Sequence, residues 1–462
     1  MIALDAAGVA AAVGGSLVDC PDPRVRVTGA AADSRLVTPG DLYVAIAGER
    51  VDGHDFAPAA HRAGAVLTLG SRPTGLPTVV VDDPVAALGR LASHVLASLP
   101  DATVVAITGS SGKTTTKDLV AGLLEDLGPT VAPSGSFNTE VGVPLTILRA
   151  TEATRFLVLE MGARGLGHVA TLCRIAPPDI AVVLNVGSAH AGEFGGREVT
   201  ARAKSEIVSA LGHDGLAVLN ADDPLVAAMA GLARGDVVTF GGGPAATVRA
   251  VDLVLDEGAR PSFTLSTPEG QAPVRMQMVG EHMASNGCAA AAVALRLGMT
   301  VERVAQLLSG AQPRSRWRME VTTTPDGVTV VNDSYNANPE SMRAALRSLA
   351  AMGRGAGGRT FAVLGEMREL GEDSISAHDE IGRLAVRLDI WRTIAVGTGA
   401  RALFLGAAQE GSWNDEAAWV PDPQAAVAAV RKQVRPGDVV LVKASRSVGL
   451  EAVATALMEA PE

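Results

Sequence analysis

The sequence predicts an α/β fold of three domains: a small mixed N-terminal domain, a central parallel sheet with helices on both faces, and a doubly wound C-terminal domain. Short runs of Val, Ile, Leu and Ala alternate with helical patterns over most of the chain, as in parallel sheets that are covered on both faces. Aromatic residues make up only 3% of the sequence, which favours close helix-on-sheet packing over a β-sandwich. The length of 462 residues is typical of three domains at roughly 150 residues each.

The N-terminal domain is predicted to span residues 1–100. Three apolar runs, "DLYVAIAG", "GAVLTLG" and "TVVVDD", are typical of short strands, and a helix from about Val85 to Leu99 follows them. The segment "LPDAT" then breaks the helix and marks the boundary. The apolar start "MIALDAAGVAAAVGG" lacks a basic region and contains Asp5, so we do not expect a signal peptide.

The central domain, residues 101–312, alternates strand and helix patterns in its first part. Between Thr247 and Val279 short alternating runs separated by turn residues predict antiparallel hairpins, and a helix from about Glu281 to Leu297 follows. The expected parallel strands are residues 103–108, "RFLVLE", "DIAVVLN", "GLAVLN" and "DVVTF".

The C-terminal domain, residues 313–462, repeats the alternation and predicts a second doubly wound, Rossmann-like unit. Its expected elements are "GVTVVND", the helix "PESMRAALRSLAAM", "RTFAVLG", a helix near 376–388, "RTIAVG", a helix over 424–434 and "DVVLVKA".

Composition excludes several classes of protein. The net charge of -11 argues against a nucleic-acid-binding surface, so anionic ligands would need local cationic sites. No uninterrupted apolar stretch of about 18 residues exists, so we expect no membrane insertion. Cys20, Cys173 and Cys288 lie far apart without nearby His partners, which indicates reduced thiols in a cytoplasmic chain rather than a zinc site. Nothing indicates an oligomer, so a monomer is the default.

The stretch "VVAITGSSGKTTTKDLV" predicts a phosphate-binding loop of the P-loop ATPase kind. An apolar strand turns through Gly109 and Gly112 into a helix, which aims backbone N–H groups and the positive end of the helix dipole at one point. Lys113 adds a cation, and the Thr114 hydroxyl can hold Mg²⁺. Ile107 stands where the first glycine of the longer pattern would be, so only the short form T-G-x-x-G-K-T is present.

Two further residues follow neighbouring strands and are candidate metal ligands. Glu160 ends "RFLVLE", where an acidic side chain can hold the magnesium that the loop also touches, although an exposed strand-end carboxylate is the alternative. His190 lies in "VLNVGSAHAGEFG" just past another strand, and is either a ligand or a solvated side chain.

Lys204 shares a helical face with Ile207, Val208 and Leu211, which form an apolar stripe. A protonated amine there is costly, so the side chain must reach the edge, pair with a carboxylate or lose its proton. Composition alone favours the first outcome. A neutral amine can also add CO₂ and become a carbamate, which is an oxygen ligand for a hard cation.

The segment "VVNDSYNANPESM" joins a strand to a helix. Asn338 at the N-cap and Pro339 at the first helical position are explained by a well-capped helix start. Asp333, Tyr335 and Asn336 are not, and polar groups at the carboxyl end of a parallel strand are where such sheets bind ligands. "LGEMRELGEDSISAH" repeats this placement after the next strand.

Three arginines, Arg314, Arg316 and Arg318, cluster where the second and third domains join. They are either an interdomain set of salt bridges or anion contacts that respond to domain closure.

Taken in order, these motifs resemble the Mur ligases of peptidoglycan synthesis, over nearly the whole chain. Within the family the sequence is most similar to the members that add D-alanyl-D-alanine to UDP-N-acetylmuramoyl-tripeptide. Met283 departs from the Asn that is common after "GEH", and Ala444 and Gly449-Leu450 depart from a Gly and a Met-Glu pair. The motifs that carry the resemblance are "TGSSGKTTTK", "SFNTEVGVPLTIL", "LEMGARGLGHV", "NVGSAHAGEFG", "ARAKSEI", "GEHMASN", "NDSYNANPESM", "LGEMRELG" and the N-terminal "DSRLVTPGDLYVAIAGERVDGHDF".

The resemblance implies that ATP phosphorylates the terminal carboxylate of the tripeptide, and that the dipeptide amine then displaces phosphate from the acyl phosphate. The implied cofactors are ATP, Mg²⁺ at two sites and CO₂ as a lysine carbamate. Residues around the ATP phosphates are Gly109, Ser110, Ser111, Gly112, Lys113, Thr114 and Thr115. Thr114 and Glu160 hold the first magnesium, and His190 and carbamylated Lys204 hold the second.

The same resemblance implies contacts to the remaining substrate groups. Adenosine contacts are Asn286, Arg318 and Asp333, and further substrate contacts are Asn138 and, on the uridine side, Ser34 and Arg35 with the loop Asp52 to Phe56. Tyr335 and Asn336, with the Glu366 loop, lie near the dipeptide or its acyl acceptor. Two alternatives remain: the preceding Mur ligase, which adds a diamino acid, and a nucleotide switch without catalysis. Whether the third peptide residue is lysine or diaminopimelate is open.

Overall fold

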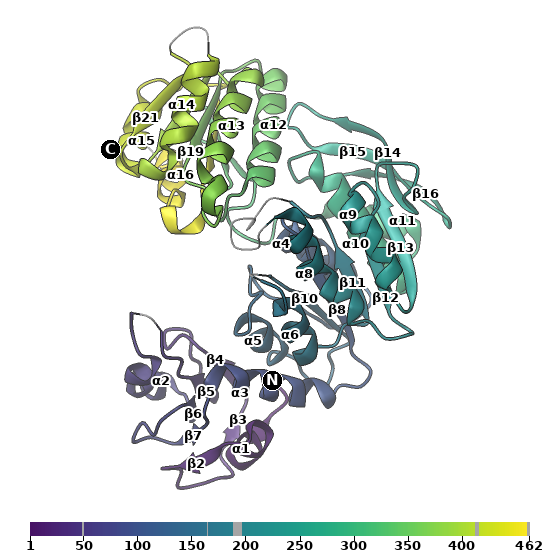
Figure 1. Ribbon diagram of the computed structural model, residues 1–462, viewed down its shortest axis with the longest axis vertical. Coiled ribbons are helices and arrows are strands. Elements are labelled where there is room, and N and C mark those ends of the chain that lie inside the picture. Colours follow the sequence, from purple (N-terminus) through teal and green to yellow (C-terminus); the bar gives the residue numbers. More distant parts are fainter. Residues whose placement is uncertain (49, 164, 188–195, 412–414, 460–462) are drawn as a thin grey trace.

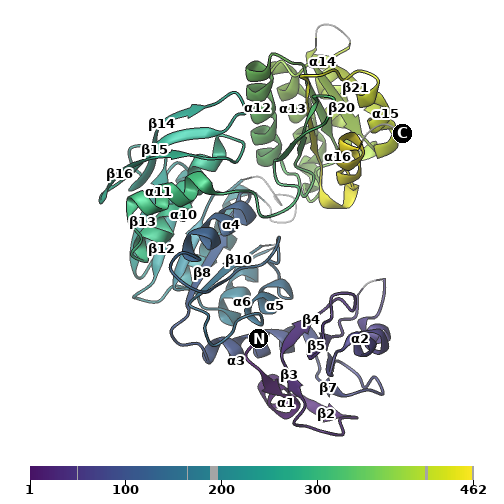
Figure 2. The ribbon, with the colours of Figure 1, turned by 180° about the vertical axis from the view of Figure 1, so that it is seen from behind.

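The structure, a computed structural model, describes residues 1–48, 50–163, 165–187, 196–411 and 415–459. Three sheet-bearing units follow one another along the long axis of the molecule, and the central unit lies between the other two (Figure 1). The view from behind shows the same order, with the chain's N-terminus near the junction of the first two units (Figure 2). The predicted α/β class with three units is therefore confirmed.

The first unit holds a five-stranded sheet whose strands are parallel apart from β2, which pairs antiparallel to β7. Strand β5 is shorter than predicted, because the chain turns after Val44 and Ala47 pairs back onto Asp52. In sheet order the strands are β2 (Ser16–Val18), β7 (Thr78–Val80), β6 (Leu67–Gly70), β5 (Asp41–Val44) and β4 (Gly29–Ala31). The remaining elements are β1 (Leu4–Asp5), β3 (Arg26–Val27), α1 (Ala6–Val13), α2 (Ala57–Ala63) and α3 (Pro84–Ala97).

The central unit is built on a nine-stranded sheet. The predicted hairpins are confirmed, and they extend this same sheet: β14 pairs parallel to β13, and β15 and β16 then add antiparallel. In sheet order the strands are β16 (Gly270–Arg275), β15 (Pro261–Thr267), β14 (Val248–Leu255), β13 (Asp236–Gly241), β12 (Leu216–Asn220), β11 (Ile180–Val183), β8 (Thr103–Thr108), β10 (Phe156–Glu160) and β9 (Thr130–Val131).

Helices cover both faces of this sheet. Along β8, Val104 and Ala106 belong to one apolar cluster while Val105 and Ile107 belong to another, because successive strand side chains point to opposite faces. This explains why the strand reads as a continuous apolar run. The helices are α4 (Lys113–Leu124), α5 (Gly142–Ile147), α6 (His168–Ile175), α8 (Arg197–Ser209), α9 (Pro224–Ala227), α10 (His282–Arg296) and α11 (Val301–Gly310).

The third unit contains a six-stranded sheet with one antiparallel edge strand, β17. The start of α12 is as predicted: Asn338 and Ser341 form a reciprocal capping box, and Pro339 is the first helical residue. In sheet order the strands are β17 (Glu320–Thr323), β18 (Thr329–Asn332), β22 (Val439–Lys443), β19 (Thr360–Leu364), β20 (Arg392–Val396) and β21 (Ala417–Val420). The helices are α12 (Pro339–Ala356), α13 (Ser374–Arg387), α14 (Arg401–Glu410), α15 (Pro423–Arg431) and α16 (Glu451–Met458).

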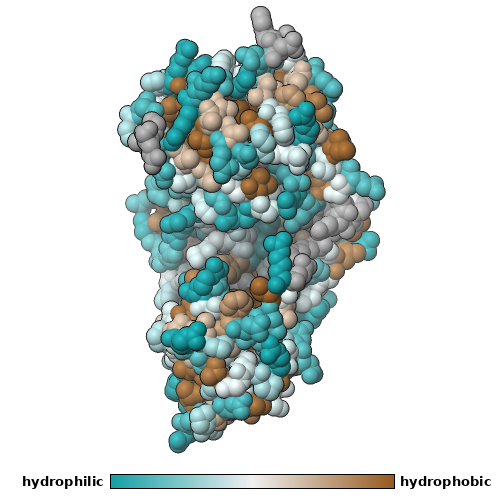
Figure 3. Space-filling model, turned by 90° about the vertical axis from the view of Figure 1, so that its left-hand side faces the viewer, coloured by the Kyte–Doolittle hydropathy of each residue, from teal (hydrophilic) through white to brown (hydrophobic). Residues whose placement is uncertain are grey.

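The third unit contacts the central one at more than one place among the described residues. The turn between β14 and β15 packs on α12, so that a side chain at Gly355 would strike the backbone of Glu257, and Ala259 joins the third unit's apolar core. Another contact is the candidate site described below. Seen from the side, the surface mixes hydrophilic and apolar residues and is hollowed at mid-height (Figure 3). Among the described helices, none is both long and apolar enough to cross a membrane.

Candidate active site

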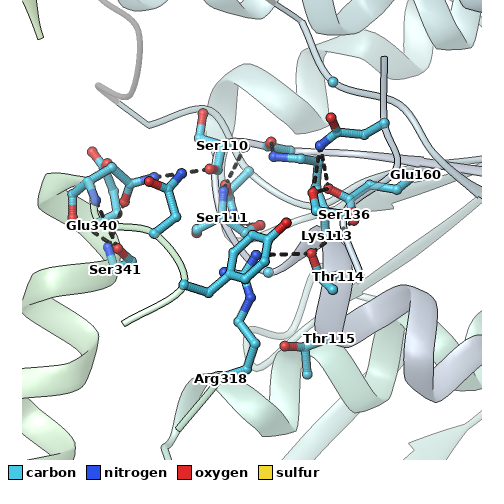
Figure 4. A pocket seen from close by; sticks show the side chains of 18 of the residues that line it. Ser110, Ser111, Lys113, Thr114, Thr115, Ser136, Glu160, Arg318, Glu340 and Ser341 are labelled. Atoms are coloured by element: carbon cyan, nitrogen blue, oxygen red, sulfur yellow. Dashed lines mark hydrogen bonds between the residues drawn. The ribbon is translucent and has the colours of Figure 1, made fainter. Parts of the chain in front are cut away.

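A cavity of about 440 Å³ lies where the carboxyl ends of the central strands meet the third unit (Figure 4). Central-unit residues come from the loop before α4, the end of β10, α8 and α10. Third-unit residues include the segment before β17, the loop between β18 and α12, the first turns of α12, and Lys443 at the end of β22. The structure therefore brings motifs of the central and third units together, such as those of Thr114 and Arg318, which are 204 residues apart in the sequence.

The loop before α4 has the form of a phosphate site. Gly112 has a φ of 80°, in the left-handed region that favours glycine, and it turns the chain into the helix. No side chain caps this helix, so its first-turn N–H groups remain available to an anion. The Lys113 ammonium folds back and donates to the Gly109 carbonyl at 2.8 Å, and burial lowers its pKa.

Two other amides of the loop already have a partner that the sequence did not single out. The side-chain oxygen of Asn185, just past the end of β11, accepts from the amides of Ser110 at 3.0 Å and Ser111 at 2.9 Å. Gly109 is required here, because a Cβ would come within 2.9 Å of Leu184. The prediction that Gly109 to Thr115 surround phosphate stays a prediction, but these two amides face the protein.

The Glu160 carboxylate accepts hydrogen bonds from several neighbouring side chains (Figure 4). Its Oε2 accepts from the Thr114 hydroxyl at 2.9 Å, and its Oε1 accepts from Ser136 at 2.8 Å and Asn138 at 2.7 Å. A buried carboxylate and a hydroxyl at the start of an uncapped helix form an oxygen donor set that suits Mg²⁺. Asn138 was expected to contact substrate. In the structure its side-chain amide donates to Glu160, the predicted metal ligand.

Lys204 lies on α8 and lines the cavity, with only 3% of its surface exposed. It does not reach the surface, and no salt-bridge partner for it exists among the described residues. Burial, helped by the nearby charge of Lys113, lowers its pKa to about 7. A substantial fraction of neutral amine at neutral pH follows. His190 lies outside the described residues.

Arg318 reaches into the cavity from the third unit. Its guanidinium donates to the Thr114 hydroxyl oxygen at 3.1 Å and stacks on the Tyr335 ring at 4.3 Å. The residues on either side, Trp317 and Met319, both have positive φ values of 59° and 49°. Such backbone costs about 1–3 kcal/mol per residue and persists where the surroundings impose it.

Asp333 is held on both oxygens. Oδ2 accepts from the Lys443 ammonium at 2.6 Å and Oδ1 accepts from the Met319 amide at 3.2 Å. Lys443 also donates to the Asn336 carbonyl at 2.9 Å, and burial lowers its pKa while Asp333 opposes that shift. Asn338 links the same loop to the central unit by donating to the Ser110 carbonyl at 3.1 Å.

The arginine cluster divides between its two predicted roles. Arg314 forms a two-pronged salt bridge with Glu125, the C-cap of α4, at 2.6 and 2.7 Å, and Ser315 donates to Asp118 of that helix at 2.6 Å. Arg314 is therefore an interdomain contact. Arg318, in contrast, lines the cavity and is placed to meet an anion.

The remaining predicted residues fall into two places. Asn286 is buried at the cavity wall, where a Cβ on Gly112 would come within 2.9 Å of its side-chain oxygen. Ser34 and Arg35 lie in the first unit and do not line this cavity; Arg35 pairs with Asp33 at 2.6 Å and lowers the pKa of that carboxyl to about 2. The cavity therefore assembles the predicted ATP and dipeptide residues, and leaves the uridine residues on the first unit.

Sequence reasoning missed Ser136, Asn185 and Lys443. Asn185 follows the predicted strand "DIAVVLN", so its position after a strand was an available signal. Ser136 lies in the motif "SFN", which was noted for Asn138, and no predicted strand precedes it. Lys443 ends the apolar strand "VVLVK", and that local pattern predicts only a strand residue there.

This fold and this cavity define an α/β enzyme of the nucleotide-phosphate-binding class, in which a third unit meets the phosphate loop. The sequence matches the family models for the Mur ligase middle domain over residues 107–294, the Mur ligase glutamate ligase domain over 317–446 and the Mur ligase catalytic domain over 26–95. The chain belongs to the Mur ligase family.

Among its relatives are proteins named UDP-N-acetylmuramoyl-tripeptide–D-alanyl-D-alanine ligase. The Mycobacterium bovis protein is 50% identical over 99% of this chain and 98% of its own length. The Escherichia coli K12 protein is 35% identical over 92% of this chain and 93% of its own length. A crystal structure of MurF from Acinetobacter baumannii has a TM-score of 0.88 at 31% identity and covers 99% of both chains. MurF ligase from Thermotoga maritima, solved in complex with ADP, has a TM-score of 0.80 at 32% identity, over 94% of this chain and 97% of that one.

Proposed function

We propose that this protein ligates D-alanyl-D-alanine to UDP-N-acetylmuramoyl-tripeptide at the expense of ATP, giving the pentapeptide precursor of peptidoglycan, ADP and phosphate. The observation that carries the proposal is the cavity itself, in which an uncapped helix start, Lys113 and the Glu160 group face Arg318 and Asp333 of the third unit. Full-length relatives that carry the ligase name support the choice of substrates.

The chemistry requires a carboxylate to become an electrophile. An oxygen of the tripeptide carboxylate attacks the γ-phosphorus of ATP, and the bond from that phosphorus to ADP breaks. The dipeptide amine then attacks the acyl carbon, loses a proton, and the tetrahedral intermediate expels phosphate. Such a sequence needs charge neutralisation and positioning more than covalent help from the protein. Lys113 and the first-turn amides of α4 supply both at the phosphates.

Magnesium is the ion that the donor set at Glu160 fits. Thr114 and Glu160 would hold one ion, and Lys204 as a carbamate with His190 would hold a second. Bound magnesium would neutralise phosphate oxygens and favour attack at phosphorus. Ser136 and Asn138 orient the Glu160 carboxylate by donating to one of its oxygens, which leaves the other beside Thr114.

The carbamate on Lys204 is supported by burial and by its pKa of about 7. The neutral amine attacks the carbon of CO₂ and releases one proton, so a buried base becomes an anion that suits a cation-lined cavity. The neighbouring charge of Lys113 both lowers the pKa of the amine and stabilises the product anion.

The three units divide the substrates between them in this proposal. Residues 1–100 bind the uridine nucleotide through Ser34 and Arg35, and residues 101–312 bind ATP. Residues 313–462 bring Arg318 and Asp333 to ATP, while Tyr335 and Asn336 lie toward the dipeptide.

The test is product formation by the purified protein. Tripeptide nucleotide, D-alanyl-D-alanine and magnesium-ATP together are expected to give an amide-linked pentapeptide by mass spectrometry, with one phosphate released per amide. Phosphate release that does not depend on D-alanyl-D-alanine, but does depend on a diamino acid together with UDP-N-acetylmuramoyl-dipeptide, would identify the preceding ligase instead. Release that ignores every peptide substrate would identify a nucleotide switch.

A further inference from the structure

Asn185 makes several hydrogen bonds to the phosphate loop, yet the proposed function assigns it no role. Its side-chain oxygen accepts from the Ser110 and Ser111 amides, and its side-chain amide donates to the Ser111 carbonyl at 3.2 Å. The backbone carbonyl of Asn185 accepts a second bond from Ser110 at 3.2 Å. Asn185 thus bonds to three successive peptide groups of the loop, from Gly109 to Gly112.

The backbone next to Asn185 is itself held by hydrogen bonds at Leu184, Val186 and Gly187. The Leu184 carbonyl accepts from Asn220 at 2.8 Å, and the Val186 amide donates to Asp223 at 2.8 Å. The Gly187 amide donates to the Ser110 hydroxyl at 2.9 Å. Because its support is held by the next strand, Asn185 sets the shape of the loop.

These bonds divide the amides near the expected phosphates into two sets. Those of Ser110 and Ser111 are used by the protein, whereas the first turn of α4, beginning at Lys113, has no side-chain cap. We propose that Asn185 is a positioning residue for the ATP phosphates: it keeps the first two amides on the protein and thereby aims the α4 amides at the nucleotide. This inference rests on the proposed function, since it takes ATP as the ligand of the loop.

Nuclear magnetic resonance of the full-length protein tests the division directly. With ¹⁵N on serine, threonine and lysine, ADP is added without magnesium. The amide signals of Lys113 and Thr114 are expected to shift strongly, and those of Ser110 and Ser111 to shift less. Equal shifts at all four would mean that phosphate displaces Asn185, which overturns the inference and leaves the proposed function intact. No ADP binding at all would overturn both.

Variants test the positioning by affinity. Asn185→Ala leaves the Ser111 amide without its acceptor and the Ser110 amide with only the backbone carbonyl of residue 185, and is expected to raise the ADP dissociation constant and the KM for ATP about tenfold, the effect of about one hydrogen bond. Asn185→Asp keeps the oxygen that accepts from the two amides, but its second oxygen replaces the N–H donor and repels the Ser111 carbonyl. This variant is therefore expected to displace the loop by repulsion, whereas Asn185→Ala removes hydrogen bonds. ADP affinity within about twofold of wild type in both folded variants would refute the positioning role.

The same two substitutions at Asn220 are the matched control. Asn220 also makes two hydrogen bonds at a strand end, to the Leu184 carbonyl and from the Asp222 amide, but none to the loop. Because Asn220 reaches the loop only through the segment that carries Asn185, its variants are expected to lower the melting temperature as much as the Asn185 variants do and to raise the ADP dissociation constant clearly less. If Asn185 and Asn220 variants lose melting temperature and ADP affinity in the same proportion, Asn185 acts only on stability and the inference is wrong.

Discussion

Removing Asp333 is expected to destabilise the third unit strongly, because it would leave the Lys443 ammonium buried without its partner. The two side chains are 1% and 10% exposed, and they meet at 2.6 Å. Breaking a buried pair by deleting one partner costs about 3–5 kcal/mol. At about 2–4 °C per kcal/mol for a unit of this size, the transition of the third unit in Asp333→Ala should fall by roughly 10 °C.

Scanning calorimetry with ADP absent measures this cost apart from any nucleotide contact. The double variant Asp333→Ala, Lys443→Met removes the unpaired charge and is expected to recover most of the loss, since an apolar side chain of similar length replaces the ammonium. A loss below about 1 kcal/mol in the single variant, or no recovery in the double, would refute the reasoning about this pair.

The pH dependence of the single variant has a definite sign. Burial lowers the pKa of Lys443 in the folded protein, and loss of Asp333 lowers it further, because that carboxylate opposed the shift. Between the folded and the unfolded pKa the unfolded chain binds more protons, so stability rises with pH in that window. The cost of Asp333→Ala should therefore shrink as pH rises toward the pKa of an unfolded lysine. A cost that grows with pH would contradict this assignment of charge.

Three further outcomes follow from the cavity. Glu160→Gln should weaken ATP binding about tenfold or more in magnesium and leave magnesium-free ADP binding nearly unchanged, which calorimetry with and without a chelator measures. Lys204→Ala should abolish turnover without lowering the melting temperature, because it removes a buried amine that has no salt-bridge partner among the described residues, and short-chain carboxylic acids should restore part of the rate. Arg314→Ala should change kcat/KM less than about fivefold, because its half-exposed pair with Glu125 is worth at most about 1 kcal/mol, and a larger loss in steady-state kinetics would show that this contact sets the third unit's position.

The elements that the sequence predicted well are those that local pattern determines. Residues 103–108 form β8 with the predicted bounds, because a β-branched run between a proline break and a glycine turn leaves no other low-energy choice. Asn338 and Pro339 likewise specify the start of α12 by local hydrogen bonding. In contrast, all four residues of β17 are exposed and only Val321 among them is apolar, so no apolar alternation marked that edge strand.

Within the site, residue types were predictable while partners were not. The buried face of Lys204 could be read from its spacing to Ile207 and Val208, since helical periodicity is a property of neighbouring residues. The contact between Asn185 and Ser110 joins residues 75 positions apart, and that between Lys443 and Asp333 joins residues 110 apart. Only the register of the folded sheets brings such pairs together, so no local pattern could show them.

The charge of the cavity explains how a chain with a net charge of -11 can hold several anions. Of the basic side chains lining it, Lys443 is neutralised by Asp333, and Lys204 has a pKa of about 7. Lys113 and Arg318 are left to supply positive charge to a bound phosphate, and they come from the central unit and the third unit, respectively. The cationic site is complete only when the third unit is seated, since Arg318 enters with that unit. Electrostatics thereby links phosphate binding to the position of the third unit, because an anion that favours Arg318 at Thr114 favours the same seating.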